Sequence, residues 1–250
     1  MKWTILICVL VVAGLVACSG EPDSSSFGKA APQLASEASA KLRILIIGGT
    51  SGVGLEVVKL ALKRGHHVIA MARSPERITL SHKNLDIIKG DILDITSVTD
   101  SMAGADAVVI AIGTGPTRKP VSVFSQGTAN VLIAMKKQDV QRLIEITGIG
   151  AGNSRGHGGL FYDKVMQPLL LSTVYEDKDR AEALIFESES KWTIVRPGFL
   201  NDDVSEKEYR VIEDVQGVTS GSIARADVAH FIVSALEMDN HIGDTVLLTN

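Results

Sequence analysis

Apolar residues recur in short runs along most of the chain, and within these runs polar residues do not alternate with apolar ones. This pattern indicates strands that are buried on both faces, as in a parallel sheet. Longer segments with helical periodicity, such as residues 121–137 and 226–238, lie between the runs. The alternation predicts an α/β fold with a doubly wound parallel sheet in a single domain, residues 41–250. The expected strands cover residues 42–47, 68–72, 84–89, 106–112, 141–147, 192–196 and 245–249, and the last of them is expected to close the sheet.

The N-terminal segment follows a different pattern. Lys2 precedes an apolar run over residues 3–17, and a Ser-rich stretch follows, which is the layout of an export signal. Residues 15–18, Leu-Val-Ala-Cys, also resemble the lipobox of bacterial lipoproteins, in which the cysteine is acylated. We therefore expect residues 1–18 to be a lipoprotein-type signal segment. Lipidated Cys18 would then anchor the protein on a membrane, facing the periplasm.

Two alternatives to this interpretation stay open. One is an uncleaved single-span anchor, although the apolar run is shorter than the roughly 20 residues that a bilayer core needs. The other is a mis-assigned start codon. If the segment is not a working signal, the protein is cytoplasmic. Residues 19–40 are rich in Ser, Ala and Pro and predict a flexible tether.

A glycine-rich turn follows the first expected strand of the domain. Three glycines with the spacing G-x-x-x-G-x-G let the backbone turn sharply and approach a pyrophosphate, and they let the next helix pack closely on the strand. The N-terminus of that helix favours negative charge. We therefore predict dinucleotide binding, although an ordinary glycine-rich loop is the simpler alternative. The residues expected to hold the phosphates are Gly48, Thr50, Ser51, Gly52, Val53 and Gly54.

Residues at the ends of the following strands predict how the rest of the cofactor is held. NAD-selective sites place an acidic residue about 20 positions beyond the glycines, whereas this chain has Arg73. A cation accommodates a 2′-phosphate, so we expect NADP(H) rather than NAD(H), unless Arg73 is only a solvated loop charge. Asp91 and Ile92 are expected at the adenine end, where the alternative for Asp91 is a turn-forming role. Gly113 is expected to pass under the ribose.

Composition and charge exclude several classes of function. The chain has 250 residues and 45% hydrophobic residues, enough for a full core, and its net charge of −4 gives no electrostatic case for nucleic acid. Its two cysteines, Cys8 and Cys18, both precede the domain. A disulfide framework, a Cys-ligated metal and a catalytic thiol are therefore excluded there. Adjacent His66 and His67 point to opposite faces of a strand, so we expect no metal site.

The combined motifs resemble those of a known family. The turn GGTSGVG, Arg73, the segments GDILD and ITGIGAG, KDRAE at residues 178–182 and WTIVRPGFL at residues 192–200 are similar to those of atypical short-chain dehydrogenase/reductases. The most similar branch is that of NmrA-like proteins and biliverdin reductase B/flavin reductase. The resemblance covers residues 41–250 and implies a Rossmann fold, NAD(P)H binding and oxidoreductase activity.

The chain departs from the main short-chain dehydrogenase branch at the catalytic positions. That branch has a Ser at the end of the fifth strand and a Tyr-x-x-x-Lys pair, in which Lys lowers the pKa of Tyr. Here Thr147 takes the place of the Ser, and Tyr175 and Lys178 are only three residues apart. We retain these three as catalytic candidates, and by resemblance Lys178 is also expected to touch the nicotinamide ribose. The alternatives are a packing role for Tyr175 and a surface ion pair between Lys178 and Glu182.

Two functions follow from this sequence. The first is an NAD(P)H-dependent oxidoreductase that transfers hydride to a small-molecule acceptor such as a flavin or a quinone, without a full Ser-Tyr-Lys triad. The second is a non-catalytic NADP(H)-binding sensor or regulatory module. The glycine-rich segment 148–159 is too long for a simple connection and is expected to be a substrate lid. It contains His157, a further catalytic candidate.

Overall fold

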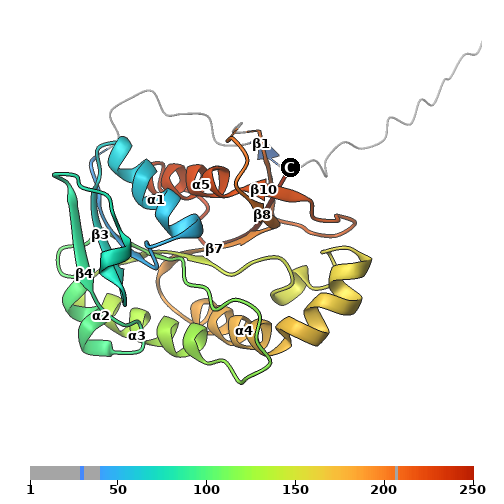
Figure 1. Cartoon of the computed structure of the whole chain (residues 1–250). Helices are drawn as coiled ribbons and strands as arrows, with labels where there is room; N and C mark the ends of the chain where they lie inside the picture. Colours follow the sequence, from blue (N-terminus) through green and yellow to red (C-terminus); the bar gives the residue numbers. More distant parts are fainter. Residues whose placement is uncertain (1–28, 31–39, 206–207) are drawn as a thin grey trace, which may run out of the picture.

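A mostly parallel sheet forms the centre of the computed structural model, which describes residues 29–30, 40–205 and 208–250 (Figure 1). Among these residues the sheet has nine strands in the order β1-β9-β11-β7-β6-β5-β2-β3-β4. All neighbouring pairs from β11 to β4 are parallel, and β9 is antiparallel to both β11 and β1. The segment β4-β3-β2-β5-β6-β7 has the strand order of a Rossmann fold, which confirms the predicted fold class.

The elements follow one another as the apolar pattern predicts. The strands are β1 (Lys29–Ala30), β2 (Arg43–Ile47), β3 (His67–Ala72), β4 (Leu85–Lys89), β5 (Ala107–Ile110), β6 (Arg142–Ile146), β7 (Lys191–Pro197), β8 (Phe199–Asn201), β9 (Arg210–Ile212), β10 (Ser222–Ala224) and β11 (Asp244–Thr249). The α-helices are α1 (Gly52–Lys63), α2 (Ile95–Ser101), α3 (Val123–Gln138), α4 (Ser172–Phe186) and α5 (Arg225–Glu237). Short 3₁₀ turns form η1 (Pro75–Arg77) and η2 (Gly152–Ser154), and η3 (Tyr162–Leu171) is a π-helix.

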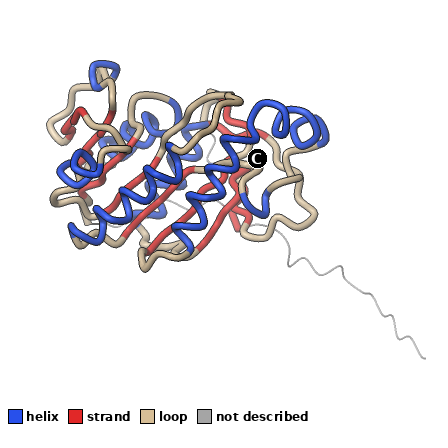
Figure 2. The backbone as a smooth tube through the Cα atoms, turned by 90° about the horizontal axis from the view of Figure 1, so that it is seen from below, coloured by secondary structure: helices blue, strands red, loops and turns tan. Residues whose placement is uncertain are grey.

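Helices cover both faces of the sheet. In Figure 1, α1 and α5 lie on one face and α2, α3 and α4 on the other, and Figure 2 shows helices running side by side along the strands. Strand β2 explains why the apolar runs are unbroken. Its residues Ile44 and Ile46 belong to the hydrophobic core under α1 and α5, whereas Leu45 and Ile47 belong to the core on the other face. A strand buried on both faces favours apolar side chains at every position.

The sheet continues beyond the strand that was expected to close it. Strand β11 pairs with β7 on one side, but β9 pairs with its other side and β1 follows. The expectation that β11 ends the sheet is therefore wrong. The segment between β7 and α5 folds back onto the sheet, and its strands β8 and β10 form a separate parallel pair.

Two residues of the expected tether are structured. Lys29 and Ala30 form β1 and pair with Arg210 and Val211 of β9, because the edge of the sheet offers unpaired backbone groups. For these two residues the prediction of a free tether is corrected. The expected signal segment, residues 1–18 with Cys18, lies outside the described residues. In the described part of the chain, no helix is long and apolar enough to cross a membrane.

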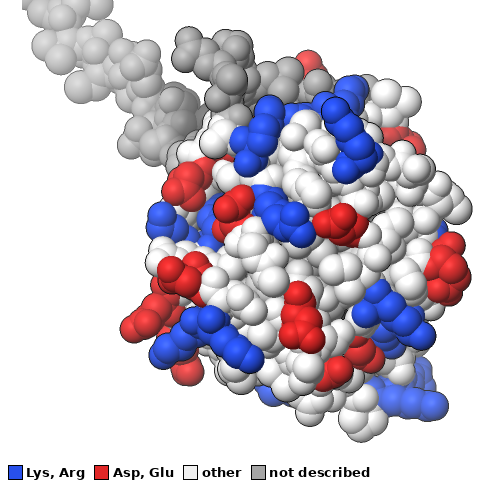
Figure 3. Space-filling model, turned by 90° about the vertical axis from the view of Figure 1, so that its left-hand side faces the viewer, with Lys and Arg blue, Asp and Glu red and all other residues white. Residues whose placement is uncertain are grey.

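Charges of both signs are mixed on the face that Figure 3 shows, at the side of the molecule where β3 and β4 lie. Lys and Arg side chains alternate there with Asp and Glu, and no continuous basic surface covers that face. This arrangement is that of an ordinary solvated surface.

Candidate cofactor and acceptor site

The glycine turn connects β2 to α1 at the carboxyl edge of the sheet. Gly48 has a φ of +99°, and a Cβ there would lie 2.5 Å from the carbonyl oxygen of Ala111, just beyond β5. A Cβ on Gly54 would overlap the carbonyl oxygen of Gly48. Both glycines are therefore needed for close packing of the turn against the neighbouring strand and the helix.

The third glycine of the motif faces open space. Gly52 has a φ of +58°, and a Cβ built on it would have no neighbour nearer than the Arg225 side chain at 3.9 Å. Ser51 is the N-cap residue of α1 but makes no capping hydrogen bond with its side chain. An open space at an uncapped helix N-terminus fits a pyrophosphate. Thr50 is half-buried and Ser51 exposed, whereas the Val53 side chain is buried in the core and could contribute only its backbone amide.

Arg225 is a residue of this site that the sequence analysis did not identify. It is the first residue of α5, and its side chain reaches over the glycine turn, where its Nε is 3.9 Å from the position of a Gly52 Cβ. Its Nη1 donates a 2.8 Å hydrogen bond to Oδ1 of Asp202. In the sequence, Arg225 is only a cation at the start of an expected helix. Its position alone does not indicate that it lies next to Gly52, which is far away along the chain.

The expected residues of the adenosine end lie on the strands next to β2. Gly48 donates a backbone hydrogen bond to Met71 of β3 at 3.2 Å, so Arg73, just beyond β3, lies beside the turn. Arg73 is exposed, and within the described residues no ion pair or hydrogen bond engages its guanidinium. Such a cation is available to a 2′-phosphate.

Asp91, Ile92 and Gly113 differ in what they leave available to a ligand. Oδ1 of Asp91 accepts a 3.0 Å hydrogen bond from the backbone of Leu93, which is the turn-forming role considered as an alternative. Ile92 is 5% exposed and packs in the core, so that its side chain is not part of a binding surface. A Cβ on Gly113 would meet nothing within 4 Å. Gly113 therefore borders open space, and its expected place under the ribose stays a prediction.

Thr147, Tyr175 and Lys178 meet at the carboxyl end of β6. A Cβ on Gly148 would lie 3.3 Å from the Tyr175 hydroxyl and 3.7 Å from Nζ of Lys178. However, the Lys178 ammonium donates to the carbonyl oxygen of Thr147 and lies 4.9 Å from the centroid of the Tyr175 ring. The Thr147 hydroxyl donates a 2.7 Å hydrogen bond to Glu182. The structure brings the three candidates together, but without a Lys to Tyr hydroxyl hydrogen bond.

Burial determines the protonation of this cluster. It raises the pKa of the Tyr175 hydroxyl, and the neighbouring Tyr162 raises this pKa further. Burial also lowers the pKa of Lys178 to about 8 and raises that of the neighbouring Glu145 to about 8. Tyr175 is thus a neutral hydrogen-bond donor near neutral pH, not an acid with a lowered pKa.

Glu182 is buried, which contradicts the alternative of a surface ion pair with Lys178. It is 1% exposed and binds the guanidinium of Arg196 on β7 through both carboxylate oxygens, with an Nε to Oε1 distance of 3.0 Å. The same guanidinium donates to the side chain of Asn153. Glu182 and Arg196 therefore tie α4 and β7 to the glycine-rich segment.

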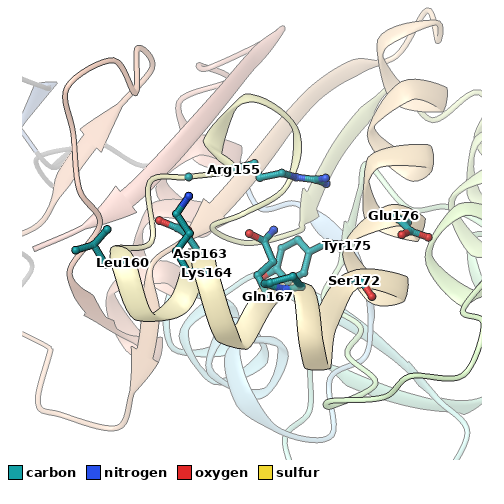
Figure 4. Close-up of a pocket in the computed structure, with 10 residues that line it drawn as sticks. Arg155, Leu160, Asp163, Lys164, Gln167, Ser172, Tyr175 and Glu176 are labelled. Atoms are coloured by element: carbon teal, nitrogen blue, oxygen red, sulfur yellow. The ribbon is translucent and has the colours of Figure 1, made fainter.

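A cavity of about 450 Å³ lies between the glycine-rich segment, η3 and the start of α4. Figure 4 shows Gln167 and Tyr175 side by side, with the Arg155 side chain extended above them. Tyr175 belongs both to this cavity and to the Gly148 cluster. The cavity therefore adjoins the expected nicotinamide end of the cofactor and is the candidate acceptor site.

The glycine-rich segment, which is expected to be a substrate lid, is hydrogen-bonded to η3, and its residues Arg155 and Gly156 line the cavity. Its residues Ile149 and Gly150 accept hydrogen bonds from Tyr162 at 3.0 Å and from Gln167 at 2.7 Å, both on η3. Nδ1 of His157 donates to the carbonyl oxygen of Val218 at 2.7 Å, and His157 is not among the residues that line the cavity. This hydrogen bond of His157 holds the glycine-rich segment against Val218.

Comparison with known proteins identifies the family. Residues 48–239 match the family model described as NAD(P)H-binding. The chain belongs to this NAD(P)H-binding family. An uncharacterized chloroplastic protein of Arabidopsis thaliana is 30% identical over 202 residues, which are 78% of this chain and 71% of that protein. Family membership and the open space at Gly52 both indicate a nicotinamide dinucleotide as the cofactor.

Solved structures show the same fold. A short-chain dehydrogenase/reductase from Veillonella parvula in complex with NADP has a TM-score of 0.70 and 16% identity, covering 84% of this chain and 95% of that one. ChuY, an anaerobillin reductase from Escherichia coli O157:H7, has a TM-score of 0.69 and 22% identity, covering 83% and 96%. At these identities the likeness concerns the fold. It establishes a Rossmann-like fold for the NAD(P)H-binding chain.

Proposed function

We propose that this protein is an NADPH-dependent reductase that transfers hydride to a flavin, a quinone or a similar conjugated acceptor. The observation that carries the proposal is the arrangement at Gly148. Tyr175 and Lys178 reach this residue beside a cavity, yet Lys178 donates to the Thr147 carbonyl and not to the Tyr175 hydroxyl. NADPH supplies the hydride when bound. The reductase neighbour ChuY, of similar fold, is consistent with this class of reaction.

The residues around the cavity orient the acceptor and need not protonate it. Tyr175 stays neutral because burial raises its pKa, so that it is suited to donate a hydrogen bond to a ring oxygen or nitrogen. A conjugated acceptor delocalises the charge of the reduced ring, and a solvent proton follows. A simple aldehyde places the charge on one oxygen and depends more strongly on a positioned acid.

The preference for NADPH rests on Arg73. Its guanidinium is exposed and lies beside the glycine turn, where it would bind the 2′-phosphate. A solved structure of the same fold is in complex with NADP. These two observations support NADP(H) over NAD(H).

The test is consumption of NADPH by the purified full-length protein, followed by its absorbance with flavins, quinones and simple aldehydes as acceptors. We expect turnover with at least one flavin or quinone and little with the aldehydes. Turnover with aldehydes alone would contradict the proposal. Saturable NADPH binding without turnover on any acceptor would favour the alternative function, a non-catalytic NADP(H)-binding module. The observation that favours this alternative is that Tyr175 and Lys178 do not have the Tyr-x-x-x-Lys spacing.

We further propose that acylated Cys18 anchors the protein on a membrane. The support is the sequence pattern of residues 1–18 alone. Cys18→Ala should retain the uncleaved signal and lose the acyl chains, which mass spectrometry of the intact protein measures. The proposal is contradicted if the mass of the Cys18→Ala protein differs from that of the unmodified protein only by the substitution, and if the variant stays on the membrane after a high-salt wash.

A further inference from the structure

The outer face of η3 carries a stripe of exposed apolar side chains. Phe161, Val165 and Leu169 are 69%, 39% and 55% exposed, and Leu160 beside them is 82% exposed. Phe161, Val165 and Leu169 are spaced four residues apart. A π-helix has i to i+5 hydrogen bonds and therefore slightly more than four residues in each turn. Consequently the three side chains lie on one side of the helix. In Figure 1 this helix is the yellow segment that projects at the right-hand side of the molecule.

The opposite face of η3 is fastened by polar side chains, so the apolar face is held outward. Tyr162 and Gln167 donate to the carbonyl oxygens of Ile149 and Gly150 in the glycine-rich segment. The Tyr162 ring also contacts the ring of Phe199, with centroids 5.2 Å apart, and Phe199 is itself 40% exposed. Phe199 of β8 is therefore a further exposed apolar side chain next to η3.

Cations border the stripe. Lys164 lies within η3, is exposed and lines the mouth of the acceptor cavity. At the other end, Nε of Arg118 donates a 2.8 Å hydrogen bond to the carbonyl oxygen of Leu169, and exposed Lys119 follows it. Two acidic residues line the same cavity: Asp163 is turned toward the backbone and accepts from Gly158 at 3.1 Å, whereas exposed Glu176 lies on α4. Lysine is depleted in the cores of protein interfaces, whereas apolar side chains bordered by Lys and Arg are typical of surfaces that bind anionic lipid.

We propose that the stripe Leu160, Phe161, Val165 and Leu169, with Phe199, docks on an anionic phospholipid surface, and that the adjoining cavity takes a lipid-soluble conjugated acceptor from it. The part concerning the acceptor rests on the proposed reductase function, but docking itself does not. A contiguous apolar patch beside a cavity marks an interaction site. The apolar run at residues 3–17, which is expected to reach a membrane, points to the same kind of surface.

Docking is tested with the full chain by a fluorescent reporter. Phe161→Trp is mixed with vesicles of phosphatidylglycerol and phosphatidylcholine whose acyl chains carry bromine, which quenches indole fluorescence on contact. Ile133→Trp is the matched control, since Ile133 is a 59% exposed apolar residue on α3. We expect extra quenching over the unmodified chain for Phe161→Trp and none for Ile133→Trp. The proposal is overturned if Phe161→Trp shows no extra quenching, or if both variants are quenched equally. It is also overturned if light scattering shows a dimer that shields the Phe161→Trp side chain from the vesicles.

The acceptor is tested separately with two quinones. The double variant Phe161→Ser, Leu169→Ser should raise the KM for a long-tailed quinone in vesicles by about 10-fold or more, because docking by these apolar side chains is lost. The KM for a tailless, water-soluble quinone should stay unchanged. An equal change for both quinones would contradict a role at the bilayer. If the unmodified protein reduces neither quinone, the part of this inference that concerns the acceptor fails. The proposed reductase function is then decided by turnover with flavins, and docking by the quenching experiment.

Discussion

Arg73 and Arg225 approach the nucleotide site from different elements, and we expect them to bind different phosphates. Arg73→Ala should weaken NADPH binding by about 1–3 kcal/mol, the range for a charge-assisted hydrogen bond, and leave NADH binding nearly unchanged. Arg225→Ala should weaken both cofactors equally, because Arg225 lies over the glycine turn that holds the pyrophosphate. Titration calorimetry with both cofactors measures this. Equal losses of NADPH and NADH binding in Arg73→Ala would contradict the assignment.

The two tyrosines near the cavity should contribute little to the chemical step. Tyr175 has a raised pKa and no hydrogen bond from Lys178 to its hydroxyl, and Tyr162 donates to a backbone carbonyl. Removing a required acid costs roughly 10²–10⁴-fold. We therefore expect Tyr175→Phe and Tyr162→Phe each to lower kcat less than about 10-fold. A loss of about 10³-fold with unchanged NADPH affinity would show that one of them is the acid.

At the scale of single residues, the sequence predicted what depends on local chain geometry. Gly48 and Gly54 were recognisable because a turn followed by a helix needs glycine wherever backbones touch. The Thr147 hydroxyl, by contrast, is directed to Glu182, which lies 35 residues away on α4. Spacing along the chain contains no information on such a contact. For the same reason Arg225 was missed over a turn formed by residues far from it in sequence.

Among the elements, the contact between α4 and β7 is expected to be the most sensitive to substitution. Glu182→Leu leaves the guanidinium of Arg196, 3% exposed, buried without its partner. Such a loss typically costs about 3–5 kcal/mol, which chemical denaturation measures as a lower free energy of unfolding. The control is Glu56→Ala, which breaks the exposed pair with Lys59 on α1 and should cost at most about 1 kcal/mol. Similar losses for both variants would contradict a structural role for the buried pair.

The elements with long, regular patterns were predictable, and the short ones were not. Strands β2 to β7 lie at the positions predicted for them, and in β2, β3 and β5 the unbroken apolar runs reflect burial on both faces. Strands β1 and β9 have two and three residues, and their pairing depends on an edge formed by distant segments. η3 contains Pro168 within the helix and follows a glycine-rich segment. Both features favour a loop when only the sequence is considered.

At the scale of the whole molecule, one edge of the sheet collects the functional features. The glycine turn, Arg73 and the Gly148 cluster follow the carboxyl ends of β2, β3 and β6, where ligands of open α/β sheets bind. The cavity and the apolar stripe of η3 follow the same strand β6 along the chain. If the protein is a reductase at a lipid surface, the two substrates would therefore approach from different sides of Gly148.

The central claim is that the glycine turn holds the nucleotide, and binding of NADPH to two glycine variants tests it most directly. Gly52 and Gly104 both have left-handed backbones, with φ of +58° and +71°, and in both cases the nearest neighbour of an added Cβ is an arginine side chain at 3.9 Å. Asn tolerates this conformation, so neither Gly52→Asn nor Gly104→Asn should lower the unfolding temperature appreciably. We expect Gly52→Asn to raise the Kd for NADPH at least about 100-fold, close to 3 kcal/mol, because its side chain fills the phosphate space. Gly104→Asn should bind NADPH as the unmodified protein does, and equal affinities for the two variants would contradict the account.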